Sequence, residues 1–339
     1  MTKRRVVVTG VGPITPIGTG KEEFWANLTA GKSGIGMITQ FDTTDFNVKI
    51  AGEVKDFDFG KYGDKKEGKR MDRVTQFAVA AAKLAIEDAK LDLEKIDATR
   101  CGVCVGTGIG GIHTFLEQSL KLGAKGPSKI SPFFIPMEIP NMPAGQIGIA
   151  YGFKGPNTAI VTACATGTNC IGDALRTIQY GDADVMIAGG TEASISPIAV
   201  AGFANMKALS TNNENPEGAS RPFDKNRDGF VMGEGSGVIL LEELEHAKAV
   251  VEEYTAKIEA ITTIHRFAAD TINWETIANL PAPFTKGAQG PKEIEARNEL
   301  NSYKPGFFAK HIRSLNASVN GTLEKKIADA IEEDKQQYE

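Results

Sequence analysis

Apolar runs separated by polar or glycine-rich segments predict alternating strands and helices along the first 249 residues. Compact apolar runs predict buried strands at residues 4–9, 101–106, 159–161, 183–190 and 235–244. Helical periodicity is found at residues 21–30, at 72–90, at 141–150 and between Cys164 and Gly181. Strands that alternate with helices are typical of a layered α/β fold, so this is the fold class that we predict.

Cys164 lies where the strand predicted at 159–161 passes into a helix. Apolar residues recur on one face of that helix, at Ile171, Ala174, Leu175 and Ile178. Unpaired backbone N–H groups and the positive end of the helix dipole favour a thiolate at a helix N-terminus, and the thiolate is the nucleophilic form. The position alone permits two interpretations. Cys164 is either a catalytic nucleophile or a small buried residue that packs the strand against the helix.

Composition narrows the functional classes. The chain has 339 residues, of which 41% are hydrophobic, and this is enough for one large domain or two ordinary ones. A net charge of −5 gives no support for nucleic-acid binding, and no apolar run is long enough to predict a membrane span. The first residues pass directly into a strand pattern, so we expect no signal peptide. Four cysteines suit a reducing compartment, and we expect a cytoplasmic protein.

Three motifs resemble known sites without meeting their requirements. Cys101 and Cys104 are an odd number of residues apart on a predicted strand, so their side chains should point to opposite faces and form no disulfide. The first glycine-rich turn has Thr15 where a dinucleotide-binding turn needs its third glycine. Residues 224–235 approach a calcium loop but end in Gly235 instead of glutamate. We therefore expect no metal and no cofactor, and we interpret the segment as a structural loop tied by Arg221, Asp224, Arg227 and Asp228.

The hydrophobic pattern changes near residue 250, where the glycine-rich alternation of strands and turns ends. The last helix-like segment keeps one apolar face, at Leu323, Ile327 and Ile331. We predict a domain over residues 1–249 and a mainly helical tail over residues 250–339. The first part of this tail, "AKIEAITTI", is also compatible with one more strand.

Several motifs that occur in order along the first domain resemble one enzyme family. "TACATG", "GGTEASISPIAVAGFANMKALST" and "ASRPFDKNRDGFVMGEGSGVILLEE" resemble the β-ketoacyl-acyl carrier protein synthases, above all the bacterial type II condensing enzymes of fatty acid synthesis. "RRVVVTGVGPITPIG", "KRMDRVTQFAVAAA", "GTGIGG" and "KISPFFIP" agree, and the resemblance ends near residue 249. It implies a thiolase-like layered α/β fold, a homodimer, and elongation of an acyl chain on acyl carrier protein with malonyl units.

The resemblance also implies roles for particular residues. Cys164 aligns with the nucleophile that accepts the acyl group from acyl thioesters. Ile109 matches the residue that gates the acyl pocket, Phe203 helps to line it, and Phe133 and Phe134 fall near the dimer interface. By the same analogy, the residues that dock the acidic carrier protein are Lys66, Lys69, Arg70 and Lys207. The alternative for these four charges is an ordinary solvated surface.

The family's second half carries features that this sequence does not repeat. The missing strings are two histidine motifs, "HGTGT" and "GHxxGAAG", and a late "FGGTN" loop. The four histidines of the chain match no family histidine, so we interpret them as non-catalytic: His113, His246, His265 and His311. In the family, the paired histidines stabilise the enolate that forms when malonyl thioester loses carbon dioxide, and such stabilisation is a large catalytic term. We expect acylation of Cys164, with decarboxylation near background.

Three hypotheses about function follow. The first is a condensing enzyme of fatty acid synthesis. The second is a truncated, chimeric or engineered scaffold without full condensing activity. The third is a partner protein that works with another chain, which would supply the second half.

Overall fold

The computed structural model describes residues 3–249, which belong to one compact unit. The domain boundary expected at residue 249 and the helical tail expected over 250–339 concern residues that lie outside the described ones. His265 and His311 lie outside them as well. Within the described part of the chain, no helix is long and apolar enough to cross a membrane.

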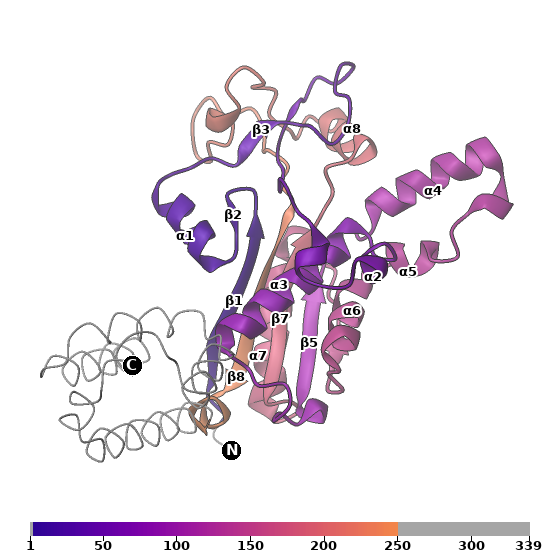
Figure 1. Cartoon of the computed structure of the whole chain (residues 1–339). Helices are drawn as coiled ribbons and strands as arrows, with labels where there is room; N and C mark the ends of the chain where they lie inside the picture. Colours follow the sequence, from indigo (N-terminus) through magenta and orange to yellow (C-terminus); the bar gives the residue numbers. More distant parts are fainter. Residues whose placement is uncertain (1–2, 250–339) are drawn as a thin grey trace, which may run out of the picture. The chain divides into compact units, whose positions relative to one another are not determined.

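Six strands form one mixed sheet in the order β2-β1-β8-β7-β5-β6 (Figure 1). They are β1 (Val6–Thr15), β2 (Gly18–Thr19), β5 (Cys101–Gly106), β6 (Asn157–Thr158), β7 (Val185–Glu192) and β8 (Gly235–Glu243). β5 pairs in parallel with β6 and β7, whereas β8 pairs antiparallel with β1 and β7. The sheet confirms the α/β class and four of the five predicted strands. β1 is longer than predicted, because its pairing with β8 continues past Pro13 to Ile14.

Helices cover both faces of this sheet. α3 (Arg73–Ala89) and α6 (Met142–Tyr151) pack on one face, and α7 (Thr166–Tyr180) packs on the other (Figure 1). A Cβ added to Gly12 would lie 1.9 Å from the Ala81 carbonyl oxygen, so β1 and α3 touch backbone to backbone. All three of these helices were predicted, with boundaries within two residues of those expected.

The alternation of side chains along β5 assigns its cysteines to different cores. Cys101 and Val103 pack in the core under α3 and α6, whereas Cys104 packs with Cys170 of α7. All four cysteines are free. The prediction that Cys101 and Cys104 point to opposite faces and form no disulfide is therefore confirmed.

The prediction of a buried strand at residues 159–161 is wrong. The strand β6 is only Asn157–Thr158, both exposed, and Val161 is 51% exposed. The strand pairing ends at Thr158. Ala159 and Ile160 are half-buried and pack against the two cores of the sheet without forming a strand. Apolar residues alone do not distinguish a buried strand from such a segment at the edge.

The remaining elements form the surroundings of the sheet. They are α1 (Lys21–Thr29), β3 (Ile35–Met37), β4 (Ile50–Gly52), α2 (Lys65–Gly68), α4 (Ile112–Lys125), α5 (Phe134–Glu138) and α8 (Pro197–Asn205), with short 3-10 helices at Phe59–Lys61, Ala98–Arg100, Pro127–Lys129, Ala163–Ala165 and Pro216–Gly218. Only α1 among them was predicted. α8 packs in a third apolar cluster beside β3 and β4, separate from the two cores of the sheet.

The loop at 221–228 is held by its own polar contacts. Arg221 donates to the Asn226 carbonyl oxygen over 2.9 Å and lies 3.5 Å from the Asp228 carboxylate. Arg227 donates to the Asp224 carbonyl oxygen over 2.9 Å. These contacts agree with the interpretation of the segment as a structural loop. Among residues 3–249, no group of three or more His, Cys, Asp or Glu side chains could hold a metal ion.

Candidate active site

Cys164 lies in a tight turn that leads directly into α7. The turn is the 3-10 helix Ala163–Ala165, and Ala163 adopts a left-handed backbone with φ 51°. The turn is stabilised at Thr162, whose N–H donates to the Thr166 hydroxyl over 2.9 Å. No side chain caps the N-terminus of α7, and the Cys164 residue is exposed. The thiol therefore lies at the surface, at the N-terminal end of a 15-residue helix.

The other three thiols are in different environments. Cys101, Cys104 and Cys170 are at most 1% exposed. A hydrogen bond from the Cys104 thiol lowers the pKa of Cys170 to about 7, while the same contact and burial raise the pKa of Cys104. Burial raises the pKa of Cys101 to about 12. Cys164 is thus the one thiol of the chain that solvent reaches directly.

The two residues expected to line an acyl pocket share one cavity. Its volume is about 260 Å³, and its lining is apolar: Ile109, Ile112, Ile198, Ala199, Gly202, Phe203 and Met206. Ile109 lies in the turn between β5 and α4, and Phe203 lies on α8. Phe203 is braced by Phe230, with ring centroids 5.5 Å apart in an edge-to-face arrangement. An apolar cavity of this size could hold part of an alkyl chain.

The turn that carries Ile109 adjoins the turn that carries Cys164. A Cβ added to Gly108 would lie 3.6 Å from both the Cα and the carbonyl oxygen of Ala163. Gly106, at the end of β5, is also pressed against this segment, because an added Cβ would lie 2.1 Å from the Ile160 carbonyl oxygen. The nucleophile candidate and one wall of the cavity are therefore on neighbouring, contacting loops.

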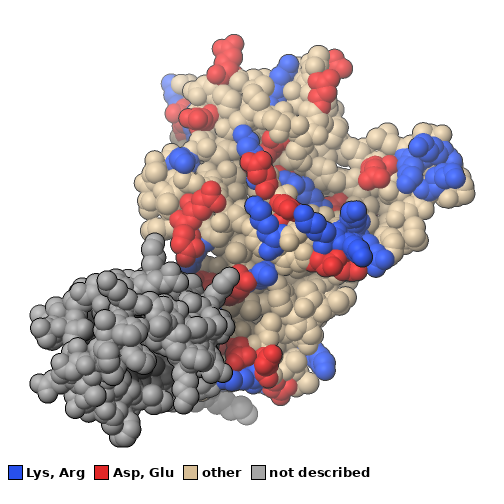
Figure 2. Space-filling view, viewed as in Figure 1, with Lys and Arg blue, Asp and Glu red and all other residues tan. Residues whose placement is uncertain are grey.

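Three of the four basic residues expected to dock a carrier protein lie close together in sequence and on one surface. Lys66 lies on α2, Lys69 and Arg70 follow it directly, and all three are exposed. Arg70 lies 3.3 Å from Glu67 and 4.9 Å from the centre of the Phe133 ring. Figure 2 shows Lys and Arg side chains gathered on the face that carries α2, with some carboxylates among them. Lys207 is exposed on a different element, directly after α8.

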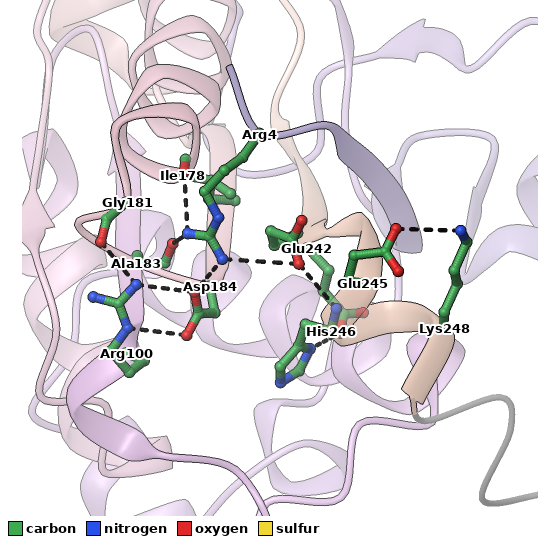
Figure 3. A network of polar contacts seen from close by, with 11 residues as sticks. Arg4, Arg100, Ile178, Gly181, Ala183, Asp184, Glu242, Glu245, His246 and Lys248 are labelled. Carbon is green, nitrogen blue, oxygen red and sulfur yellow. Dashed lines mark hydrogen bonds and ion pairs between the residues drawn. The ribbon is translucent and has the colours of Figure 1, made fainter. Parts of the chain in front are cut away.

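Neither described histidine is part of the site. His246 lies in a polar network at the end of β8, where its Nδ1 is 2.9 Å from the Glu242 carboxylate (Figure 3). This hydrogen bond raises the pKa of His246. His113 is half-buried near the start of α4, and its Nε2 has no hydrogen-bond partner.

The same network joins the start of the chain to the far end of α7. Asp184 accepts hydrogen bonds from Arg4 over 2.5 Å and from Arg100 over 2.9 Å (Figure 3). The Arg100 guanidinium holds the pKa of Asp184 at about 2. This cluster lies just before β7 begins, whereas the turn with Cys164 packs near the end of the parallel strand β5.

One polar residue of the site was missed by the sequence analysis. Glu192 ends β7, and its carboxylate accepts hydrogen bonds from Thr107 and Gly108 of the turn that carries Ile109. The available signal was a charged residue two positions after the strand predicted at 183–190, since functional groups of α/β proteins gather at the ends of strands.

Comparison with known proteins places these features in a family. Residues 3–247 match the family model described as the beta-ketoacyl synthase N-terminal domain. The 3-oxoacyl-[acyl-carrier-protein] synthase 2 of Synechocystis sp. is 55% identical over 249 residues, which cover 74% of this chain and 60% of that protein. The protein of the same name from Staphylococcus aureus is 45% identical over 319 residues, which cover 94% of this chain and 73% of that protein. The second alignment thus extends past residue 249.

Solved structures agree with these relatives. The ishigamide ketosynthase/chain length factor superposes with a TM-score of 0.66 at 36% identity. A ketosynthase in complex with its type II PKS acyl carrier protein gives 0.65 at 35% identity. Each comparison covers 73% of this chain and 60% of the other, so the chain spans about three-fifths of the length of these proteins. From its motifs, its thiolase-like sheet and these matches, the chain belongs to the β-ketoacyl synthase family.

Proposed function

We propose that the chain acts in fatty acid biosynthesis as a β-ketoacyl-acyl carrier protein synthase, with Cys164 as its nucleophile. The observation that carries this proposal is the exposed thiol at the N-terminus of α7, on a loop that contacts the wall of an apolar cavity. The names of the relatives from Synechocystis sp. and S. aureus support the reaction class.

The first half-reaction is transfer of an acyl group to Cys164. The thiolate attacks the carbonyl carbon of an acyl thioester on the carrier protein, and a new carbon–sulfur bond forms. The resulting oxyanion collapses, the bond to the carrier's sulfur breaks, and the carrier thiolate takes up a proton. Backbone N–H groups at the uncapped start of α7 suit the negative charge of the thiolate and of this intermediate.

The apolar cavity is the proposed site for the acyl chain. Ile109 and Phe203 line it from opposite elements, one from the turn after β5 and the other from α8. Burial of each methylene of an acyl chain there contributes about 0.8 kcal/mol to binding. The cavity therefore favours an acyl chain over an equally reactive short thioester.

The second half-reaction forms the carbon–carbon bond. Malonyl thioester loses carbon dioxide, the enolate attacks the acyl group on Cys164, and the Cys164 thiolate leaves. The described residues supply the acyl donor for this step, which is the thioester on Cys164. Groups that stabilise the enolate are needed as well, and the two half-reactions can be measured separately.

The test is an acylation assay on the purified chain with labelled acyl carrier protein and malonyl carrier protein. We expect label on Cys164, identified by peptide mapping, and none on the Cys164→Ala variant. The same samples report β-ketoacyl product, which measures the second half-reaction. Label that appears equally on the Cys164→Ala variant would disprove the assignment of the nucleophile.

The proposed docking surface for the carrier protein consists of Lys66, Lys69, Arg70 and Lys207. All four side chains are exposed, and acyl carrier protein is acidic, so the charges are complementary. One of the similar structures, of another protein, is a ketosynthase in complex with its acyl carrier protein.

Charge reversal tests this surface. The double variant Lys66→Glu/Lys69→Glu should slow acylation from the carrier protein about tenfold at low salt, because electrostatic attraction accelerates association. Acylation from a small acyl thioester without carrier protein should not change. Lys32→Glu, an exposed lysine on another segment, is the matched control. An equal loss with both substrates would contradict a docking role.

A homodimer is part of the proposal. β6 forms an edge of the sheet, Asn157 and Thr158 are exposed, and Val161 beside them is 51% exposed. An open edge next to exposed apolar residues tends to pair with another chain. Light scattering at micromolar concentration should show a dimer or a larger species, and a clean monomer would contradict this part of the proposal.

We also propose a cytoplasmic location. All four cysteines of the chain are free, including the exposed Cys164. Free thiols suit a reducing compartment, where an exposed thiol is protected from oxidation to a disulfide.

A further inference from the structure

The Glu192 carboxylate, at the end of β7, is surrounded by three neutral hydrogen-bond donors. Oε1 accepts from the hydroxyls of Thr107 and Ser194, each over 2.9 Å, and Oε2 accepts from the Gly108 N–H over 2.9 Å. Thr107 and Ser194 are almost fully buried. Hydrogen bonds to an ionised group are stronger than those between neutral groups. Glu192 therefore ties the strand end to the loop that follows β5.

Few backbone hydrogen bonds hold that loop, and one of them runs from the Gly111 N–H to the Glu138 carbonyl oxygen over 2.9 Å. Residues 107–111 read TGIGG, and we refer to them as the 107–111 turn. Gly110 has a φ of +83°, and glycine loses more backbone entropy on ordering than any other residue. The Thr107 hydroxyl that donates to Glu192 also accepts from the Gly110 N–H over 3.3 Å. A chain of hydrogen bonds thus runs from Glu192 through Thr107 to the far side of Ile109.

The 107–111 turn contacts both parts of the proposed site. Ile109, 38% exposed, lines the apolar cavity. Gly108 packs against Ala163, the residue before Cys164. A shift of this turn would change the shape of the cavity without removing any group that reacts.

We propose that Glu192 is a positioning residue that sets selectivity for long acyl chains by holding Ile109 of the 107–111 turn at the cavity wall. This inference rests on the proposed function, because it assumes that the cavity takes the acyl chain of a group bound to Cys164. Glu192 acts through Thr107 and Gly108 and needs no contact with the substrate.

The experiment compares two electrophiles that alkylate Cys164 without any turnover. Iodoacetamide has no chain, and N-dodecyl iodoacetamide carries an alkyl chain that would enter the cavity. The second-order rate constants for Cys164 are measured by mass spectrometry, and their ratio reports how well the cavity accepts the chain. In Glu192→Gln, one amide cannot accept from all three donors, since its NH₂ group must face at least one of them. We expect the ratio of dodecyl to plain reagent to fall about fivefold, with the iodoacetamide rate within twofold of wild type.

Matched variants separate positioning from general damage. Thr107→Val removes the link between Glu192 and Gly110 and should lower the ratio to a similar extent. The double variant Glu192→Gln/Thr107→Val should then be no worse than either single variant. Ser194→Ala removes a donor to the same carboxylate that lies outside the turn, so the ratio should stay at the wild-type value. Ile109→Ala shows how far the ratio moves when the cavity wall itself is changed.

Failure of the proposed function and failure of the inference on Glu192 give different results. If the wild-type chain shows no preference for the dodecyl reagent, the cavity does not take an acyl chain, and the proposed function fails together with the inference. If the wild type shows the preference and folded Glu192→Gln and Thr107→Val keep it, the inference alone is overturned. A loss of the ratio in Ser194→Ala as large as in Glu192→Gln would also overturn it. Thermal unfolding of each variant verifies the fold, and Thr107→Val decides the result if Glu192→Gln does not fold.

Discussion

The two ends of helix α7 differ in how completely their polar groups are satisfied. At the C-terminal end, Arg4 donates to the carbonyl oxygens of Ile178 and Ala183, and Arg100 donates to that of Gly181. Both guanidinium groups also bind Asp184. Cations near the C-terminus of a helix oppose the negative end of its dipole, so charge and hydrogen bonding stabilise the same end.

The N-terminal end is left open. It has no side-chain cap, it follows a left-handed alanine, and it presents the exposed residue Cys164. Strained backbone and unpaired groups reduce stability, and they persist where they serve a site. On the proposed function, one helix separates two tasks. Its C-terminal end holds the first residues of the chain and β7 together, while its N-terminal end remains available for chemistry.

The largest effect expected from this difference is in thiol reactivity. In native protein treated briefly with limiting iodoacetamide, Cys164 should be alkylated on the order of a hundredfold faster than Cys170, which needs a local opening to react. Cys170 is the most demanding comparison for Cys164. Its pKa is lowered to about 7, which favours reaction, while burial of its side chain opposes reaction. Peptide mapping by mass spectrometry measures both sites. In denaturant, all four thiols should react at similar rates, and early labelling of Cys170 in native protein would show that accessibility is not decisive.

The second effect is on the free energy of unfolding, and it concerns the polar network at the C-terminal end of α7. Asp184→Ala leaves Arg4 and Arg100 without their shared carboxylate and should lower the free energy of unfolding by about 2–3 kcal/mol. The rate of Cys164 alkylation should stay within twofold of wild type, since the thiol lies at the other end of α7. Urea unfolding measures the first quantity and mass spectrometry the second. Asp173→Ala is the control, because this α7 aspartate is 57% exposed and pairs only loosely with Arg176.

Most of the sheet and its three covering helices could be predicted from the amino-acid pattern alone. β5 has the predicted limits, 101–106, because it is buried on both faces and its apolar run ends at glycine. The segment at 159–161 was misjudged, because apolar residues at an open edge have the same composition as a buried strand. The short helices α2 and α5 span four and five residues, too few for a periodic pattern to be detected.

The site was only partly predictable. The position of Cys164 between an apolar run and a helix left two interpretations open, and the family resemblance favoured the nucleophile. Ile109 and Phe203 are 94 residues apart in the chain, and only the family resemblance suggested that they share a cavity. Glu192 was missed because its partners, Thr107 and Gly108, are loop residues from a neighbouring strand, and hydrogen bonds between loops leave no periodic signal in a sequence.

The third prediction concerns how the free energy of unfolding changes at low pH, through Asp184 at the C-terminal end of α7. The pKa of Asp184 is lowered from 3.8 to about 2 in the folded chain, so its contribution to stability is complete above the unfolded value. It is lost as the pH falls through 3.8 towards 2, and it amounts to about 2 kcal/mol because each pKa unit corresponds to roughly 1.4 kcal/mol. The difference in unfolding free energy between wild type and Asp184→Asn should therefore shrink by this amount between pH 5 and pH 2. A difference that does not change with pH would assign the effect to packing instead of charge.

The smallest effect is expected before the N-terminal end of α7, where Ala163 adopts the left-handed conformation. Alanine there carries a steric cost of about 1 kcal/mol, which glycine avoids because it has no Cβ. Glycine also gains entropy in the unfolded chain, so Ala163→Gly should raise the free energy of unfolding by only about 0.5 kcal/mol. The matched control is Ala26→Gly, the same chemical change at an exposed position within α1, which should lower stability by about 0.5–1 kcal/mol. Urea unfolding of the two variants should thus give changes of opposite sign. Changes of the same sign would mean that the turn before Cys164 is not strained, and the contrast between the ends of α7 would then rest on hydrogen bonding and exposure alone.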